Sequence, residues 1–462
     1  MRHVKKRSKR LNWPATSDAK GEYTQFYHVL SSETSSRMAQ FAAICYFRRL
    51  FTEDSNPPPY FNDTMIDILL NVMGAAPEDR STDERTEAAW TITNLFCAKD
   101  LRHTTLEKGA LPILVHGIAE GEARFRDQCI WAVGNIAADC DDCRDAVRST
   151  FALELVARQL AEGVYTSAET HKCAIWSSLN TIRGNVGVLR IELQTASHLI
   201  DGISRSLKTY PGDNNLMLDS LLALSHLADD RLYDAQTWSK VIDHLLNDAR
   251  IIDTTFDVLC DASPTLASPA LRLLGNIITG SDAQTNRLVT RPRFMSMMAV
   301  LMKSTNAQVQ REAVWVTSNI VAGPSAHVNL VTTNPELMTM LLRLLHSDDT
   351  KLQREVFWTL INLLSSYTVH ERPDDLEEFL GYGVLSMTRY LSRRDMDRKT
   401  ARKAAEVLKP ILAARPEWAV KIGEYVAGGD PANPVTALYT PPKLTRPRTE
   451  YLLVSYDYYK KE

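Results

Sequence analysis

The chain has 462 residues, of which 44% are hydrophobic and 24% are charged, proportions that are ordinary for a folded protein in water. No apolar run approaches the roughly 20 residues of a membrane span, and the basic N-terminal segment has no apolar core behind it, which excludes a secretory signal. The net charge of −3 divides into +6 for residues 1–20, +1 for residues 429–462 and therefore −10 for residues 21–428. An acidic body argues against nucleic acid as a ligand and favours basic partners.

The N-terminal segment, residues 1–20, contains the basic run from Lys5 to Arg10. Two interpretations stay open. It is either a disordered basic arm, or a peptide of nuclear-localisation type that lies in an acidic groove of its own chain and is autoinhibitory. A helical pattern then begins at about Tyr23 and runs to Phe51, and it stops at the prolines that follow Asn56 because proline cannot continue a helix.

A tryptophan four residues before an asparagine recurs along the chain. The copies are Trp90/Asn94, Trp131/Asn135, Trp176/Asn180, Trp315/Asn319 and Trp358/Asn362, with degenerate copies at Leu222/His226 and Arg272/Asn276. Successive copies are 41 to 50 residues apart, which is the period of armadillo-type helical repeats. One supersecondary unit is therefore stacked many times.

Each unit is predicted to contain a short helix, a polar turn and a long helix that carries the Trp/Asn pair. Gly109–Pro112 opens one such short helix, whereas Asp261–Pro264 and Ser268-Pro269 are expected to lie in a loop between units. The last unit is opened by Gly381 and Gly383 and has Lys409-Pro410 in place of Trp and Asn, as is typical of a capping repeat. The sequence predicts an all-α fold, a right-handed superhelical armadillo-repeat solenoid of about nine to ten repeats.

The boundaries follow from composition. We expect the solenoid to occupy residues 21–428, preceded by the basic arm of residues 1–20 and followed by a Pro/Tyr-rich tail of residues 429–462. The prolines of that tail preclude a regular helix.

The pair is expected to point away from the core. Ile130, Val133 and Ile136 follow one another at intervals of three and form the buried stripe, so Trp131 and Asn135 lie on another face of the same helix. A single Trp of this kind is most simply a core residue. Seven Asn-type positions on one face favour a binding surface instead, because a buried amide without partners costs about 1–3 kcal/mol.

The cysteines predict a protein with reduced thiols, and the absence of catalytic motifs predicts that it is not an enzyme. The seven cysteines are odd in number and scattered, which suits free thiols in the cytoplasm or nucleus. Cys140 and Cys143 have CxxC spacing, but no second pair and no histidine cluster completes a zinc site, so no metal and no cofactor are predicted. The chain has no Gly-rich phosphate loop, no HExxH and no nucleophile elbow, and we expect no catalysis.

The repeated blocks resemble importin-α, the armadillo-repeat adaptor of nuclear import. The resemblance lies in Glu87–Asn94, Trp131–Asp139, Ser268–Gly280 and Arg311–Asn319, and it includes the replacement of Trp by Arg at Arg272. It covers roughly residues 37–420. It implies a fold that binds extended basic peptides, in which indole faces flank Lys and Arg stems, Asn amides hold the peptide backbone and carboxylates select the charged heads.

The resemblance also implies two peptide-binding sites. The major site would consist of Trp90, Asn94, Trp131, Asn135, Asp139, Trp176, Asn180 and Asp219, with Asp139 pairing a ligand lysine. The minor site would consist of Ile278, Thr279, Trp315, Ser318, Asn319, Glu355, Trp358 and Asn362. For the acids a plainer interpretation stays open: Asp139 as a residue of a helix C-terminal turn, and Glu355 as a surface acid.

The major site departs from the family pattern at five positions. Ala98 and His103 replace a Gly and a Thr that hold the key lysine, and Leu222, His226 and Cys173 replace a Trp, a Tyr and an Asn. The family also carries an Arg-rich importin-β-binding segment of several dozen residues before the repeats, for which residues 1–20 are too short. Coupling to importin-β is therefore either lost or different.

Two functions follow as hypotheses. The first is an importin-α-like adaptor of the cytoplasm and nucleus that binds Lys/Arg-rich segments of cargo proteins for protein import into the nucleus. The alternative is an armadillo scaffold built stably into a larger assembly, cytoskeletal or ribosomal, without transport activity.

Overall fold

The chain is entirely helical in the part that the structure describes. The computed structural model describes residues 19–53, 58, 61–184, 190–261, 263–344, 347 and 349–370, which form 21 α-helices and one 3-10 helix. The basic arm up to residue 18, the last unit around Gly381 and Lys409, and the tail of residues 429–462 lie outside the described residues. The prediction of an all-α fold is confirmed.

The chain divides into two compact units, residues 1–189 with 194–210 and residues 190–193 with 211–462. The first unit contains α1 (Ala19–Ser31), α2 (Arg37–Glu53), α3 (Thr64–Gly74), α4 (Thr82–Phe96), α5 (Lys99–Glu107), α6 (Ala110–Glu120), α7 (Ala123–Asp139), α8 (Asp141–Arg148), α9 (Ala152–Glu162), α10 (Ala168–Ile182) and nearly all of α11 (Leu193–Thr209). The second contains α12 (Asn214–Leu227), η1 (Asp230–Leu232), α13 (Ala235–Asn247), α14 (Ala249–Cys260), α15 (Pro264–Ile278), α16 (Asp282–Val289), α17 (Phe294–Leu301), α18 (Ala307–Val321), α19 (Ser325–Thr332), α20 (Pro335–Leu344) and α21 (Thr350–His370).

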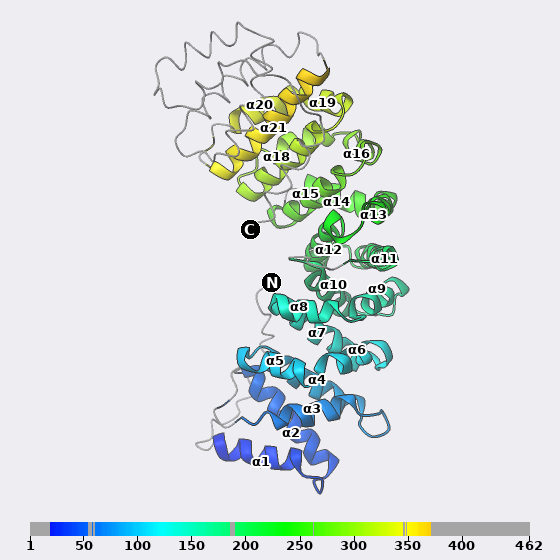
Figure 1. Cartoon of the computed structure of the whole chain (residues 1–462), viewed down its shortest axis with the longest axis vertical. Helices are drawn as coiled ribbons and strands as arrows, with labels where there is room; N and C mark the ends of the chain where they lie inside the picture. The colour runs from blue at the N-terminus through cyan, green and yellow to red at the C-terminus, as the bar shows by residue number, and fades with distance from the viewer. Residues whose placement is uncertain are drawn as a thin grey trace, which may run out of the picture. The chain divides into compact units, whose positions relative to one another are not determined.

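The first unit is built from stacked layers of helices. The long helices α2, α4, α7 and α10 contact one another in succession, and the shorter helices α3, α6 and α9 do the same. Figure 1 shows α5 and α8 on one side of the long helices and α6 and α9 on the other. Each repeat therefore consists of a short, a middle and a long helix, as in α5–α6–α7 and α8–α9–α10, and the long helix is the one that carries Trp and Asn.

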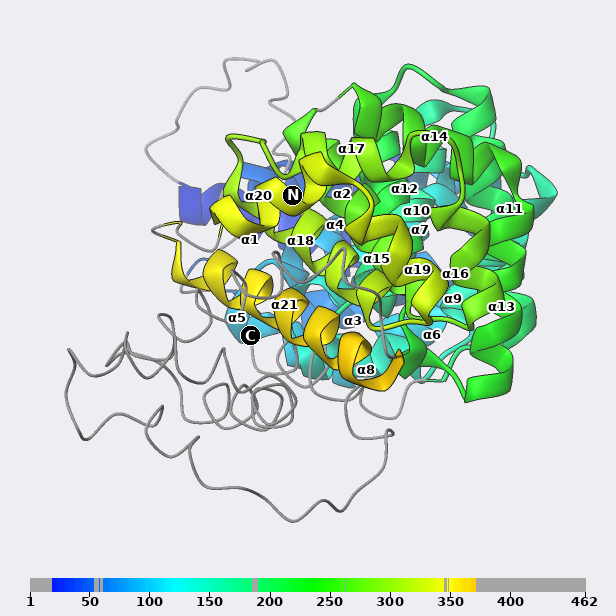
Figure 2. The ribbon, with the colours of Figure 1, turned by 90° about the horizontal axis from the view of Figure 1, so that it is seen from above.

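The second unit repeats this arrangement. Here α12, α15, α18 and α21 are the long helices in contact, while α13 contacts α16 and α14 contacts α17. Figure 2 shows α18 and α21 side by side on one flank of this unit and α13 on the opposite flank. None of the described helices combines the length and the apolar character that crossing a membrane requires.

Local sequence signals explain where many helices begin. Ser81, Ser167 and Ser281 each form a capping box with the residue three positions later, so that orphan N–H groups of the first turn find acceptors. Gly109 precedes α6 with a positive φ of 87°, a conformation that favours glycine, and the prediction that Gly109–Pro112 opens a helix is confirmed.

Two boundary predictions need revision. Ser268-Pro269 does not lie in a loop but inside α15, which begins at Pro264. Pro269 is only the sixth residue of the helix, so it removes one backbone hydrogen bond near the N-terminus, and burial of its neighbours Leu266, Ala270 and Leu271 offsets that loss. The helical pattern of residues 23–51 is also interrupted, because α1 ends at Ser31 and the serine-rich segment before Arg37 separates it from α2.

The N-terminus of α4 is held by a buried carboxylate. Glu84 accepts hydrogen bonds from Arg37 (Nη2–Oε2, 2.7 Å), from Arg80 (Nη1–Oε1, 2.9 Å) and from the backbone N–H of Ser81 (2.9 Å), and its side chain is 6% exposed. Burial alone raises the pKa of this carboxyl, but the hydrogen bonds from Arg37, Ser81 and Arg80 outweigh burial and lower the pKa from 4.5 to about 2.

We expect Glu84→Gln to destabilise the chain by about 2 kcal/mol at neutral pH, since glutamine keeps the capping box but loses the charge. A carboxyl whose pKa is lowered on folding contributes stability above pH 4.5, and that contribution is lost as the pH falls toward 2. Urea unfolding of wild type and of Glu84→Gln between pH 7 and pH 2 should therefore show free energies of unfolding that differ at neutral pH and converge in acid. The exposed neighbour Glu78 provides the control, because Glu78→Gln should leave stability within about 0.5 kcal/mol of wild type at every pH. A constant difference for Glu84→Gln across the pH range would contradict this account.

Candidate functional site

Within each unit the Trp/Asn pairs recur on successive long helices, and we call the set of pairs the Trp/Asn ladder. It comprises Trp90/Asn94 on α4, Trp131/Asn135 on α7 and Trp176/Asn180 on α10 in the first unit, and Trp315/Asn319 on α18 and Trp358/Asn362 on α21 in the second. On α7, Ile130, Val133 and Ile136 are each 1% exposed, while Trp131 and Asn135 are partly exposed. The prediction that the pair points away from the buried stripe is confirmed on this helix.

Exposure differs along the ladder. Trp90, Trp176 and Trp358 are partly exposed like Trp131, whereas Trp315 is buried, with 7% of its surface exposed. Among the asparagines, Asn180 is buried and the others are partly exposed. Some ladder residues thus pack between helices, and others contribute to the exposed surface.

The asparagine amides link each long helix to the one before it. In most pairs Nδ2 donates to the backbone carbonyl of the residue that immediately precedes the Asn position of the previous repeat. These bonds are Asn180 to Gly134 (3.4 Å), Asn276 to Ser225 (2.8 Å), Asn319 to Gly275 (3.3 Å) and Asn362 to Ser318 (3.2 Å). Asn94 makes the corresponding bond to Arg48 (3.2 Å), whereas Asn135 donates to Trp131 of its own helix (3.0 Å).

These hydrogen bonds use only the Nδ2 end of each asparagine side-chain amide. In the hydrogen bonds found for the ladder asparagines of the described chain, Nδ2 is the donor and Oδ1 is not used as an acceptor. An amide carbonyl oxygen can accept two hydrogen bonds, so each partly exposed asparagine keeps an acceptor for a backbone N–H of a ligand. The residue therefore stabilises the repeat stack and still offers a contact.

Two glycines make room for the tryptophans. A Cβ atom at Gly134 would lie 2.9 Å from Cε3 of Trp176, and one at Gly275 would lie 2.6 Å from Cη2 of Trp315. Such separations are shorter than real carbon atoms adopt, so the absence of a side chain lets the indole lie directly against the preceding long helix. Both glycines also supply the carbonyl to which the next asparagine donates.

The first ladder tryptophan is covered by an arginine of the chain itself. The Arg48 guanidinium lies 4.4 Å from the centroid of the Trp90 ring and forms an ion pair with Glu87, one turn before Trp90. The Trp90 and Trp131 ring centroids are 5.9 Å apart at an angle of 55°. These two indoles are therefore in contact, and a ligand side chain would lie against their outer faces rather than between them.

The second unit contains a similar group. Arg272 lies 4.7 Å from the Trp315 ring centroid and forms an ion pair with Glu312, which is 2% exposed. Burial raises the pKa of the Glu312 carboxyl, and Arg272 opposes that rise. Sequence reasoning missed Arg48, Glu87 and Glu312, although an acid three residues before the Trp position recurs in the chain.

Asp139, which the resemblance assigned to a ligand lysine, has a partner inside the chain. Its carboxylate forms an ion pair with Arg102 of α5, and the two side chains are 29% and 14% exposed. A lysine that binds Asp139 would have to compete with this arginine. The second acid assigned to the major site, Asp219, lies in the second unit on α12 and is 4% exposed.

The other predicted minor-site residues lie on or beside the long helices of the second unit. Thr279 is exposed, directly after α15, whereas Ile278 and Ser318 are 4% and 2% exposed. Ser318 accepts hydrogen bonds from Asn362 through both its carbonyl and its hydroxyl oxygen, each at 3.2 Å. Glu355 is 7% exposed, which rules out the interpretation of this residue as a surface acid.

The substituted positions of the major site differ in exposure. Ala98 is 2% exposed, while Leu222 and His226 are partly exposed and occupy the Trp and Asn positions of α12. Burial raises the pKa of the Cys173 thiol to about 12, so a neutral thiol stands where the resemblance to importin-α implies an amide.

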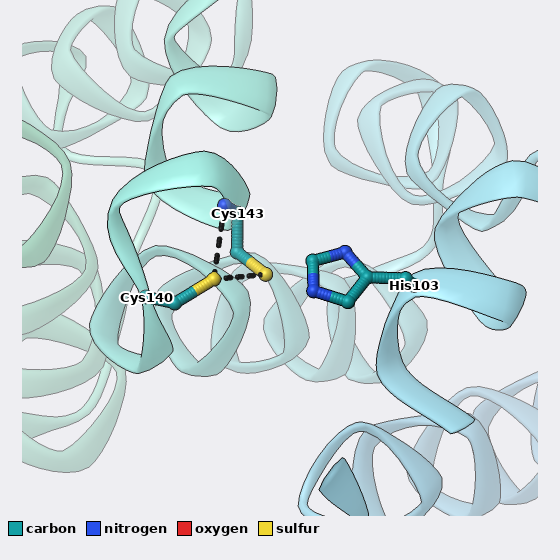
Figure 3. Close-up of side chains that lie close together, drawn as sticks. All are labelled: His103, Cys140 and Cys143. Carbon is teal, nitrogen blue, oxygen red and sulfur yellow. Dashed lines mark hydrogen bonds between the residues drawn. The ribbon is translucent and has the colours of Figure 1, made fainter. Parts of the chain in front are cut away.

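One prediction about the cysteines needs revision. The sequence showed no second Cys pair and no histidine cluster beside Cys140 and Cys143, but a single histidine, His103 of α5, lies beside both thiols, and the three possible ligand atoms are within 4.8 Å of one another. Figure 3 shows the imidazole and the two sulfur atoms facing each other from separate helices. The histidine is 37 residues before Cys140 and belongs to the preceding repeat, so local spacing could not reveal it. All seven cysteines are described, and each is a free thiol.

Comparison with known proteins finds relatives among importin-α subunits. No family model matches the chain. The chain is 26% identical over 295 residues to importin subunit alpha-1b of Oryza sativa subsp. japonica, a match that covers 62% of this chain and 51% of that protein. It is also 26% identical over 279 residues to importin subunit alpha-3 of Arabidopsis thaliana, covering 60% and 49%. The chain thus spans about half the length of the curated relatives it matches.

Among solved structures, the crystal structure of an engineered protein matches with a TM-score of 0.68 at 18% sequence identity, covering 90% of this chain and 97% of that one. This likeness concerns the fold alone. The chain is distantly homologous to importin-α subunits over about 60% of its length, and its fold is an all-α repeat solenoid of armadillo type.

Proposed function

We propose that this distant homologue of importin-α subunits binds extended Lys/Arg-rich peptide segments on the Trp/Asn ladder and acts as an adaptor for nuclear import, shared between cytoplasm and nucleus. The observation that carries the proposal is the ladder itself. Partly exposed indoles recur beside asparagines whose Oδ1 atoms are not used within the described chain. Indole faces attract the charged heads of Lys and Arg and cover their aliphatic stems, while amides pair with an extended backbone.

In the first unit, the binding surface is formed by the indoles of Trp90, Trp131 and Trp176, and at Trp90 a ligand cation would displace the Arg48 guanidinium that covers the ring. The Arg48 guanidinium against Trp90 supports this role, because it places in the structure the same kind of cation–aromatic contact that a ligand arginine would make. Asp139 supplies the carboxylate for a ligand lysine once Arg102 is displaced.

In the second unit, Trp358 is the accessible anchor, whereas Trp315 is buried. Asn319 and Asn362, both partly exposed, would hold the peptide backbone. The overall acidity of residues 21–428 favours approach of a basic segment to either unit.

The Arg102–Asp139 ion pair gives a prediction specific to lysine recognition. We expect Arg102→Ala to strengthen binding of a lysine-rich peptide about five-fold, since a partly exposed ion pair is worth about 1 kcal/mol. Asp139→Asn should weaken the same peptide. Arg124→Ala provides the matched control, because Arg124 forms an exposed ion pair with Asp83 and should leave affinity unchanged. If Arg102→Ala weakens binding, or Asp139→Asn does not, Asp139 is not a lysine acceptor.

The import function itself is tested by nuclear accumulation. A fluorescent reporter that carries a Lys/Arg-rich segment should accumulate in the nuclei of permeabilised cells when this chain and importin-β are supplied together. The same reporter with its basic residues replaced by alanine should stay outside. Accumulation that does not depend on the chain would remove the adaptor role and leave peptide binding alone.

The alternative is an armadillo scaffold held stably in a larger assembly. The Asn and Trp contacts between consecutive helices favour it, since they would be kept for stability alone. A scaffold of this kind would bind no free basic peptide and would co-purify with a fixed partner in constant ratio.

A further inference from the structure

A cluster of three side chains of metal-ligand type lies at the junction of α7 and α8, apart from the contacts of the ladder. Cys140 follows the last residue of α7, Cys143 is in the first turn of α8, and His103 belongs to α5. The imidazole and the two sulfur atoms all lie within 4.8 Å of one another, and Figure 3 shows the ring directed toward the sulfurs from a separate helix.

The distances suit a single ion after a small adjustment. Around a tetrahedral zinc ion, with Zn–S bonds of about 2.3 Å and Zn–N bonds of about 2.0 Å, ligand atoms lie roughly 3.5–3.8 Å apart. The His103 nitrogen lies within reach of that geometry, whereas the two sulfurs, at 2.8 Å, would have to separate by about 1 Å. Cys140 can make that movement because it is partly exposed and lies between two helices, outside both.

A backbone donor already faces the Cys140 sulfur. Cys140 is the N-cap of α8, and its Sγ accepts a hydrogen bond from the backbone N–H of Cys143 at 3.2 Å. Two thiolates, one imidazole and Zn²⁺ would together be neutral, so the buried Cys143 would carry no uncompensated charge.

A purely redox role fits the cluster less well. In thiol–disulfide exchange the partly exposed Cys140 would be the attacking sulfur and the buried Cys143 the resolving sulfur. Such an exchange does not require the imidazole of His103, which the preceding repeat directs at both sulfurs. Two thiols and one imidazole match the mixed sulfur and nitrogen ligation that zinc prefers.

We propose that His103, Cys140 and Cys143 bind one Zn²⁺ ion, with a fourth position open to water on the side where His103 is exposed. The ion joins α5 of one repeat to α8 of the next and thereby stabilises the first unit against unfolding. This inference goes beyond the proposed function and does not depend on it, because it concerns ligation within the chain rather than peptide binding.

The test uses the full chain, reduced and stripped of metal with a chelator. We expect it to bind one equivalent of Zn²⁺ or Co²⁺, and the cobalt form should show thiolate-to-cobalt charge-transfer absorption together with the visible bands of a tetrahedral site. Binding of Zn²⁺ should also raise the unfolding temperature. We expect each of the variants His103→Ala, Cys140→Ser and Cys143→Ser to weaken the Zn²⁺ affinity by about 100-fold or more. Even substitution of a residue that only hydrogen-bonds to a metal ligand lowers metal affinity by about 10–100-fold.

The controls separate a built site from adventitious binding. Cys260→Ser removes an exposed thiol of the second unit and should leave both the stoichiometry and the affinity unchanged. His103→Ala is the most informative variant, because an exposed histidine can be replaced without loss of the fold. Failure of the reduced wild-type chain to bind cobalt, or equal binding by the His103→Ala, Cys140→Ser double variant, would overturn the proposal. So would a Cys140–Cys143 disulfide formed in air by a chain that takes up no metal when reduced.

Discussion

Gly275→Ala is expected to destabilise the second unit by about 3 kcal/mol. The added Cβ would lie 2.6 Å from Cη2 of Trp315 and closer still to Cζ3. That indole has nowhere to move, because it is buried against α15 on one side and Arg272 lies over its ring. Overpacking of a filled core typically costs 1–3 kcal/mol, and this clash is with a rigid ring, which places it at the upper end. Urea unfolding followed by circular dichroism should show a lower midpoint.

Gly212→Ala is the matched control for this substitution. Gly212 lies outside the helices, a Cβ there would meet no atom within 4 Å, and its backbone is not left-handed. Its replacement should change stability by no more than about 0.5 kcal/mol. Equal losses at Gly212 and Gly275 would mean that the packing of Trp315 on α15 is not what makes glycine necessary.

The second large effect concerns ligand binding. Trp315→Ala combined with Trp358→Ala should weaken binding of a labelled Lys/Arg-rich peptide by about 100-fold, or roughly 3 kcal/mol, as loss of an aromatic anchor does at other interfaces. Trp315 is buried, so its truncation also costs stability, and the titration must be made under conditions where circular dichroism shows the variant folded. Trp358→Ala alone, at a partly exposed position, should account for most of the loss.

Trp238 offers a control of the same chemistry. It is a partly exposed tryptophan on α13, outside the Trp/Asn ladder, and its Nε1 donates to the Ala228 carbonyl at 2.9 Å. Trp238→Ala should leave the peptide affinity unchanged. Titration curves for the double ladder variant that coincide with wild type would remove the minor-site assignment.

Periodicity explains why much of the fold could be predicted. The spacing of Trp and Asn placed both residues on one helix face and identified the long helix of each repeat, and α4, α7, α10, α18 and α21 carry them. The prediction of a loop at Pro269 was wrong because it considered only the restricted backbone of proline and its missing N–H group. Those limits matter less in the first turns of a helix, where burial of Leu266 and Ala270 offsets one missing hydrogen bond.

The long-range contacts could not be predicted from local pattern. Arg102 reaches Asp139 within one repeat, and His103 reaches Cys140 where the next repeat begins, each across more than 35 residues. Nothing in the intervening sequence encodes which of these side chains meet. The asparagines show the same limit. Their recurrence indicated an exposed ladder, but the donation of Nδ2 into the preceding helix, as from Asn319 to Gly275, depends on how the repeats stack.

Those contacts change the interpretation of the ladder. A tryptophan such as Trp176 lies against a glycine of the previous helix and an asparagine such as Asn180 bonds to its carbonyl, so both residues would be needed even without a ligand. The proposed binding would therefore depend on partly exposed indole faces and on Oδ1 atoms that the described chain does not use, together with the Asp139 carboxylate once Arg102 is displaced.

Titration of the full chain with a fluorescent bipartite Lys/Arg-rich peptide, at low and at physiological salt, tests the central claim most directly. Binding through charged and aromatic contacts should be micromolar or tighter at physiological salt and tighter still at low salt, and the alanine-substituted peptide should not bind. Absence of binding at both salt concentrations would contradict the account and would mean that the Trp/Asn ladder serves only to hold the repeats together.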